Sequence, residues 1–109
     1  MEKSDKSPNI NYYIELVGGE ESMIAELIEL LKSGFKNDFD QYLQSVREDD
    51  LDAMHKALHK LKFKVNTLSM LIQAVKVTEF EAALKQGRRI PTDKCTKVLK
   101  KVGEYINSL

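Results

Sequence analysis

The sequence predicts an all-α fold, an antiparallel up-and-down four-helix bundle preceded by a short extra N-terminal helix. Apolar residues recur at spacings of three and four over most of the chain, as they do on one face of a helix. No segment alternates apolar and polar residues with the period of two that is typical of a strand. The two prolines and five glycines are few and fall near the expected helix ends, so short loops should join long helices.

The first expected element is a short helix in the apolar stretch 10–17. It follows a polar leader at residues 1–9 and stops at the pair Gly18-Gly19, because glycine readily adopts the backbone conformation that ends a helix. Residues 10–109 are then a single domain, since 109 residues are too few for a second core.

A long second helix is expected from Glu20 and Glu21 to about Val46. Carboxylates in a first turn interact favourably with the positive end of the helix dipole. Gly34 lowers the helix preference by about 1 kcal/mol relative to alanine, but the apolar pattern continues through it. That pattern comprises Ile24, Leu27, Leu31, Phe35, Phe39, Tyr42 and Val46.

A third helix follows the acidic cluster 48–50, with Asp49 expected as its N-cap. Its apolar positions step by three and four and end near Ser69, where we expect a break. They are Leu51, Met54, Leu58, Leu61, Val65 and Leu68.

A fourth helix is expected from Leu71 to Leu84, closed by Gly87. It is apolar over more of its circumference, which indicates neighbours on several sides. After a loop at 88–92, the last helix should place one face in the core, with Cys95 as a small buried hydrophobic residue. That face comprises Cys95, Val98, Val102, Tyr105 and Leu109.

Composition excludes several classes of function. Seventeen basic and seventeen acidic residues cancel, so no net field attracts nucleic acid or an anionic membrane. No apolar run approaches the roughly 18 residues that span a bilayer, and the leader lacks the apolar centre of a signal peptide. A single cysteine excludes an internal disulfide. We expect a cytoplasmic monomer.

His59 is the candidate functional residue. At 100° per residue it lies roughly 130° from the centre of the apolar stripe, on the exposed side. Four lysines, Lys56, Lys60, Lys62 and Lys64, and no carboxylate occur between His55 and Lys64, which indicates a local basic patch suited to an anion. The alternative interpretation is a solvated surface histidine among solvated lysines.

The segment Ala57-Leu58-His59-Lys60-Leu61-Lys62, with the small residue Ser69 ten places after the histidine, resembles the signature of histidine-containing phosphotransfer (HPt) domains. Leu16-Val17-Gly18-Gly19 before an acidic helix resembles the opening of that family. Phe80-Glu81, followed by 82–87 ending in glycine, resembles its usual Leu-Glu helix. The resemblance covers nearly the whole chain.

The resemblance implies a five-helix fold based on a four-helix bundle, whose histidine accepts a phosphoryl group from the aspartate of one receiver domain and passes it to another. A neutral imidazole suits this step, because its reference pKa of about 6.5 leaves it a nucleophile at physiological pH. Lys62, one turn from His59, can stabilise the phosphoryl oxygens. The chain has no nucleotide-binding loop of its own, and the receiver would bring the magnesium.

Phe63 departs from the family pattern, which has a small residue four places after the histidine. Its wheel position is far from the core. It is interpreted either as a docking anchor for an apolar patch on a receiver or as a block that leaves a scaffold without transfer. The expected docking residues are His55, Lys56, Lys60, Phe63 and Asn66.

Two other classes of function stay open. His55 and His59 are four residues apart and Asp52 precedes His55 by three, so one helix face could offer metal ligands, although facing carboxylates would also be needed. His55 is more simply a residue at the core margin that orients or shields His59. The remaining alternative is an interaction domain without chemistry.

Overall fold

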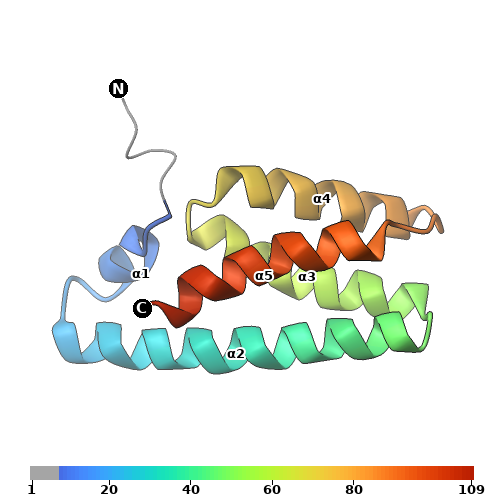
Figure 1. Ribbon diagram of the computed structural model, residues 1–109. Coiled ribbons are helices and arrows are strands. Elements are labelled where there is room, and N and C mark those ends of the chain that lie inside the picture. The colour runs from blue at the N-terminus through green and yellow to red at the C-terminus, as the bar shows by residue number, and fades with distance from the viewer. Residues whose placement is uncertain (1–7) are drawn as a thin grey trace.

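The structure, a computed structural model, describes residues 8–109. Within this range the chain is all-helical, as predicted, and its five helices pack against one another (Figure 1). Residues 1–7 of the predicted leader lie outside the described residues. The helices are α1 (Asn11–Leu16), α2 (Glu21–Arg47), α3 (Leu51–Thr67), α4 (Leu71–Lys85) and α5 (Thr92–Asn107).

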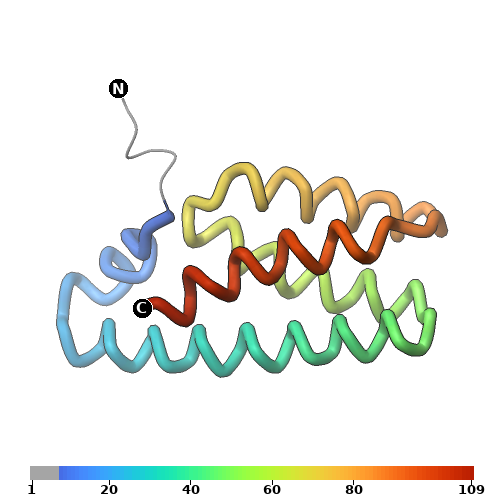
Figure 2. Tube along the Cα trace, in the orientation of Figure 1, coloured from blue at the N-terminus to red at the C-terminus, as the bar shows by residue number. Residues whose placement is uncertain are grey.

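Each of the four longer helices contacts two of the others. α2 packs against α3 and α5, and α4 also packs against α3 and α5. The short helix α1 contacts α2, and in the tube view it lies near the C-terminal end of α5 (Figure 2). None of the helices within residues 8–109 combines the length and the apolar character needed to cross a bilayer.

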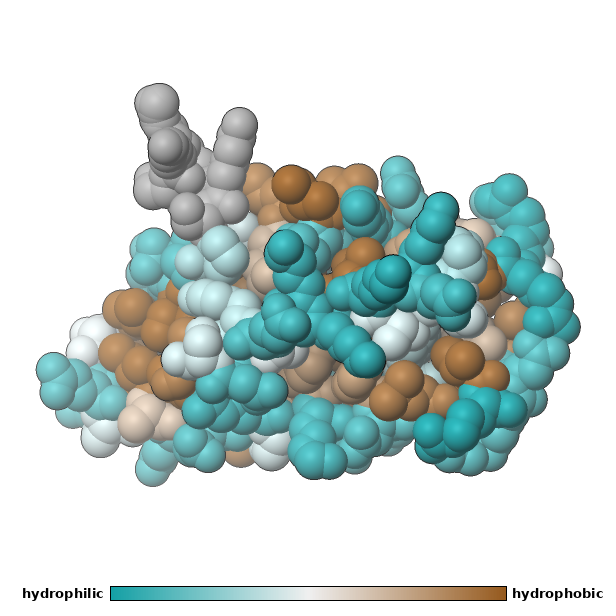
Figure 3. Space-filling view, in the orientation of Figure 1, coloured by the Kyte–Doolittle hydropathy of each residue, from teal (hydrophilic) through white to brown (hydrophobic). Residues whose placement is uncertain are grey.

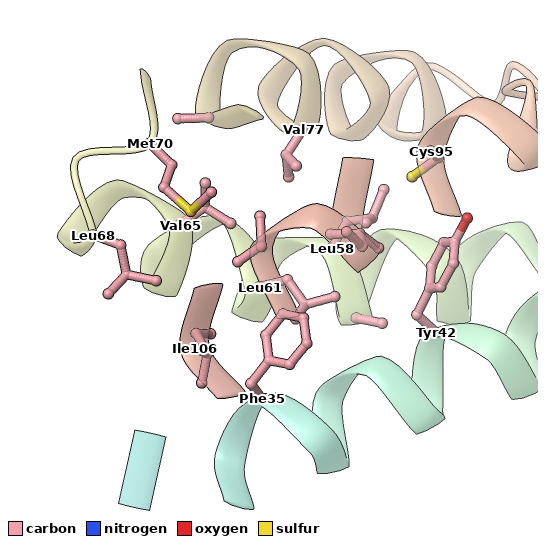
Figure 4. Close-up of a cluster of buried hydrophobic side chains, with 14 of the residues drawn as sticks. Phe35, Tyr42, Leu58, Leu61, Val65, Leu68, Met70, Val77, Cys95 and Ile106 are labelled. Atoms are coloured by element: carbon pink, nitrogen blue, oxygen red, sulfur yellow. The ribbon is translucent and has the colours of Figure 1, made fainter. Parts of the chain in front are cut away.

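The core lies between α2, α3, α4 and α5, whose apolar side chains converge in Figure 4. The predicted α3 stripe is confirmed, because all of its members except Leu51, which lies at the margin, are nearly inaccessible to solvent. Large side chains from the other helices complete the interior. Across the whole core, the largest fully buried side chains are Tyr42, Leu58, Leu61, Leu68, Leu99 and Ile106.

The start of α3 differs from the expectation in one residue. The N-cap is Asp50, whose carboxylate accepts a hydrogen bond from the backbone N–H of Ala53 at 3.1 Å. Asp49, predicted as the cap, instead has a φ of +54°, which aspartate tolerates better than most residues, and its carboxylate pairs with Arg89 beyond α4. The cluster therefore both ends α2 and begins α3.

The buried face of α5 is rotated from the predicted one. Leu99 and Ile106 are fully buried, whereas Val98, Tyr105 and Leu109 only line the margin of the core. Gly103 also lies on the buried face, and its missing side chain makes room for the ring of Phe35 on α2: a Cβ there would lie 2.9 Å from that ring.

The start of α4 is more open than predicted. The sequence indicated neighbours on several sides, but Leu71, Ile72 and Val75 are 53%, 68% and 57% exposed. Figure 3 shows hydrophobic side chains at the surface over this helix. The expectation fails because a high apolar content does not say which of the apolar residues are covered. The predicted break at Ser69 is confirmed by its φ of +59°, and Gly87, with a φ of +77°, follows the end of α4 as predicted.

Candidate functional site

His59 lies on the solvent side of α3, as predicted. Its side chain is 68% exposed, whereas Leu58 and Leu61 on the opposite side of the helix are fully buried. This difference follows from the apolar stripe, which fixes the rotation of α3 against its neighbours. The imidazole is therefore open to an approaching partner.

A buried carboxylate holds the imidazole of His59 from the neighbouring helix. Glu81 of α4 is 7% exposed, and its Oε2 atom lies 2.9 Å from Nδ1 of His59. Its Oε1 atom lies 2.6 Å from Nζ of Lys62. Glu81 thus binds two α3 side chains that are three residues apart and project from the same side of that helix.

The pKa of Glu81 reflects two opposing effects. Burial raises the pKa of a carboxyl group, but the hydrogen bonds from Lys62 and His59 outweigh burial and hold the pKa of Glu81 below its ordinary value. Glu81 is therefore ionised at neutral pH and acts as a hydrogen-bond acceptor only.

This acceptor fixes the roles of the two ring nitrogens of His59. Because an ionised carboxylate only accepts hydrogen bonds, Nδ1 of His59 carries a proton and donates it to Glu81. In the neutral ring the lone pair then lies on Nε2. Within residues 8–109, Nε2 of His59 has no hydrogen-bond partner. The ring nitrogen that carries the lone pair is therefore the one that is not hydrogen-bonded.

His55 lies one turn before His59, at the margin of the core as expected. Its side chain is 27% exposed, and its Nε2 atom is 3.2 Å from the same Glu81 oxygen that binds His59. The two imidazole rings are stacked, with centroids 6.3 Å apart. Nε2 of His55 is itself buried and forms no hydrogen bond of good geometry with any residue in the range 8–109.

The prediction of a basic patch around His59 is wrong, because most of its positive charge is compensated. The sequence between His55 and Lys64 contains no carboxylate, but three of the four lysines there each pair with a carboxylate from elsewhere in the chain. The fourth, Lys60, lies 3.4 Å from the amide oxygen of Gln41. The segment is therefore close to neutral locally, because α2, α4 and the first turn of α3 compensate its lysines. The pairs are Lys56 with Asp52 at 3.2 Å, Lys62 with Glu81 at 2.6 Å and Lys64 with Asp38 at 2.8 Å.

A groove of about 610 Å³ runs beside His59 between α2 and α3. Its α3 wall includes Lys56, His59 and Lys60, and its α2 wall includes Gln41 and Gln44. Since Glu81 binds His59 from α4, the groove lies on the other flank of the same residue. It offers a second protein a surface that reaches the imidazole.

The remaining predicted docking residues lie on the same outer side of α3. Phe63 is 59% exposed, which confirms that it is not a core residue, and Asn66 is also exposed. Of the predicted site residues, the structure brings His55, His59 and Lys62 together around Glu81. Lys56, Lys60, Phe63 and Asn66 lie outside that cluster.

Sequence reasoning did not assign Glu81 a role at the site, and it overlooked Asp38. Both are acidic residues inside an apolar stripe: Glu81 lies between Val77 and Leu84 at spacings of four and three, and Asp38 lies between Phe35 and Tyr42. A buried carboxylate needs a cationic or donor partner. An acidic residue in such a stripe therefore points to a lysine or histidine on the facing helix.

The metal interpretation gains no support from this geometry. No group of three or more histidine, cysteine, aspartate or glutamate side chains in the range 8–109 is arranged to hold a metal ion. The carboxylate nearest to the two histidines is bound to Lys62.

Comparison with protein-family models, with curated proteins and with solved structures gave no match.

Proposed function

We propose that this chain is a histidine phosphotransfer protein of the HPt class. It accepts a phosphoryl group on His59 from the aspartate of one receiver domain and passes the group to the aspartate of another. The observation that carries the proposal is the state of His59: its side chain is 68% exposed, and its Nδ1 atom is held by the buried carboxylate of Glu81. A solvated surface histidine would not need a buried partner.

The proposed architecture is an antiparallel up-and-down four-helix bundle made by α2 to α5, with α1 as an additional N-terminal helix. The closed series of contacts from α2 through α3, α4 and α5 back to α2 supports this arrangement. In such a bundle the middle of α3 is a rigid platform for His59, because three residues of its core face, Leu58, Leu61 and Val65, are fully buried.

The chemistry follows from the free nitrogen. The lone pair on Nε2 of His59 attacks the phosphorus of an aspartyl phosphate, an N–P bond forms, the P–O bond to the aspartate breaks, and the aspartate leaves as a carboxylate. The imidazole then carries a positive charge with its proton on Nδ1, 2.9 Å from the Glu81 carboxylate. The same steps in reverse pass the group to a second aspartate.

Two positive charges near the ring can stabilise the transferred oxygens. The Lys62 ammonium donates to Glu81 and has further N–H donors that can reach a phosphoryl group one turn away. Lys60, on the groove side of His59, has no carboxylate partner within residues 8–109. The chain needs no cofactor of its own for this step, and the receiver domain would supply the magnesium ion.

The proposed partners are receiver domains of response regulators or hybrid sensor kinases. They would dock over His59, with the groove lined by Lys56 and Lys60 on one flank and Phe63 one turn further along α3. Lys60, which has no carboxylate partner within residues 8–109, would offer charge to the acidic rim of a phosphoaspartate site. We propose accordingly a cytoplasmic monomer that binds one receiver at a time.

A degenerate scaffold that docks receivers without transfer is the second candidate. The observation that favours it is Phe63, a 59% exposed aromatic side chain one turn after His59, where the HPt pattern has a small residue. A ring there can shield Nε2 from an aspartyl phosphate while adding apolar contact area to the interface.

The test is transfer of radiolabelled phosphate from a panel of phosphorylated receiver domains to the full chain. The proposal expects label that is acid-labile and base-stable, as a phosphoramidate is, and its absence in His59→Gln. Lys97→Ala on the exposed surface of α5 is the matched control and should accept label normally. Receiver binding without label in the wild-type chain would instead favour the scaffold.

A further inference from the structure

Glu81 is placed to hold more than one histidine. Its Oε2 atom lies 2.9 Å from Nδ1 of His59 and 3.2 Å from Nε2 of His55. Oε1 is bound to Lys62 at 2.6 Å. The three partners are spaced four and three residues apart on α3, so a single buried carboxylate faces one continuous row of donors.

The protonation of His55 follows from its surroundings. Its Nε2 atom is buried and lies 3.2 Å from an ionised carboxylate oxygen, Oε2 of Glu81. A lone pair on Nε2 would face the negative charge of Glu81 and be repelled, whereas an N–H would be attracted. A carboxylate oxygen has two lone pairs and can accept from both imidazoles.

We propose that His55 is a positioning residue for the proposed phosphotransfer: it donates from Nε2 to Oε2 of Glu81 and thereby keeps that oxygen aimed at Nδ1 of His59. The 3.2 Å contact already has the length of a hydrogen bond but not its geometry. A small rotation of the His55 side chain would point its N–H at Oε2. His55 acts from the N-terminal side of the carboxylate and Lys62 from the C-terminal side.

This arrangement matters most when Lys62 is drawn to a phosphoryl group. Lys62 and the phosphoryl oxygens would attract each other, which loosens the hold of the ammonium on Oε1. Glu81 would then be free to rotate away from His59, unless a second donor fixes the other oxygen. His55 supplies that donor without touching the transferred group.

The first test is the tautomeric state of the imidazoles in the full wild-type chain, measured by two-dimensional ¹H–¹⁵N NMR of the histidine rings. The inference expects a proton on Nε2 of His55 and on Nδ1 of His59. An unprotonated Nε2 on His55 would overturn it. This measurement needs no variant and no receiver domain, so its outcome is independent of whether the chain transfers phosphate.

The second test compares His55→Leu with His55→Gln, whose amide N–H can replace the imidazole donor. In His55→Leu, the population of His59 with its proton on Nδ1 should fall and transfer should slow about fivefold, the factor that one hydrogen bond contributes. His55→Gln should restore both. If His55→Leu melts near the wild-type temperature and leaves the His59 tautomer unchanged, the inference fails. A wild-type chain that takes no label would overturn the proposed function instead.

Discussion

At the scale of single residues, the site depends on one buried carboxylate more than on the lysines beside the histidine. Glu81 is 7% exposed and binds His59 and Lys62 at 2.9 Å and 2.6 Å. Its lowered pKa means that burial, which opposes the charge, is outweighed by its partners. Glu81 is thus both an ion-pair partner of Lys62 and the group that orients the imidazole of His59.

The lowered pKa of Glu81 predicts how stability depends on pH. A carboxyl group with a depressed folded-state pKa stabilises the fold above its unfolded pKa, and this contribution disappears as the pH falls through the folded value. We therefore expect the wild-type chain to be more stable than Glu81→Gln at about pH 6, with the gap narrowing towards about pH 3. Urea unfolding across that range measures it. A difference in unfolding free energy between the two proteins that stays constant or widens in acid would contradict a lowered pKa of Glu81.

Phe63 decides between transfer and docking alone. If the exposed ring is a docking anchor, Phe63→Gly should weaken receiver binding roughly tenfold, as loss of an aromatic anchor does, and transfer at saturating receiver should persist. If the ring blocks Nε2, the same change should create or accelerate transfer. Binding affinity and transfer rate are measured separately. Phe63→Leu, which keeps an apolar side chain in the helix, is the control for lost helix preference.

At the scale of helices, the packing of α5 on α2 depends on a glycine. A Cβ at Gly103 would lie 2.9 Å from Cε2 of Phe35, inside a closely packed interface. We expect Gly103→Ala to destabilise the fold by about 1–3 kcal/mol, even though alanine favours the helix.

Gly34 is the matched control for this prediction. It also lies inside a helix, but a Cβ there would meet Cε of Lys64 at 3.1 Å, near the end of a long side chain that can shift slightly while it keeps its ion pair with Asp38. Gly34→Ala should therefore be neutral or stabilise by up to about 1 kcal/mol. Chemical denaturation of both variants measures the difference. Equal effects of the two substitutions would mean that the close α2–α5 approach is not required.

The sequence predicted the helices well but their neighbours less well. Spacings of three and four identify which side of α3 is buried, since that stripe is continuous from Met54 to Leu68. They do not determine which helix lies opposite a polar residue, so the contacts of Lys62 and Lys64 with carboxylates on α4 and α2 were out of reach. The same limit explains the exposed first turns of α4, because the apolar residues of this helix are spread around its circumference and define no single face.

The candidate site was predicted in part. His59 could be placed on the solvent side, because its wheel angle depends only on its own helix. The local charge around His59 could not be predicted, because the carboxylates that compensate the lysines are distant in sequence. Glu81 is 22 residues from His59, and Asp38 is 26 residues from Lys64. A single sequence carries no information about which residues pair, beyond the presence of acidic residues in its apolar stripes.

At the scale of the whole molecule, the helices hold the exposed imidazole of His59 on a packed frame. The sequence contains no P-loop motif, and its formal net charge is zero. Under the proposed function, a receiver would be recognised by shape and by the few side chains around His59. The central claim is that Glu81 holds Nδ1 of His59 and leaves Nε2 to react.

The most direct measurement is to treat the ¹⁵N-labelled full chain with phosphoramidate, a small phosphoryl donor for imidazoles, and to record ¹H–¹⁵N and ³¹P NMR spectra. We expect a single phosphohistidine at residue 59, with phosphorus on Nε2 and the proton still on Nδ1. Phosphorus on Nδ1 of His59, phosphorylation at His55 instead, or no phosphohistidine at all would contradict it.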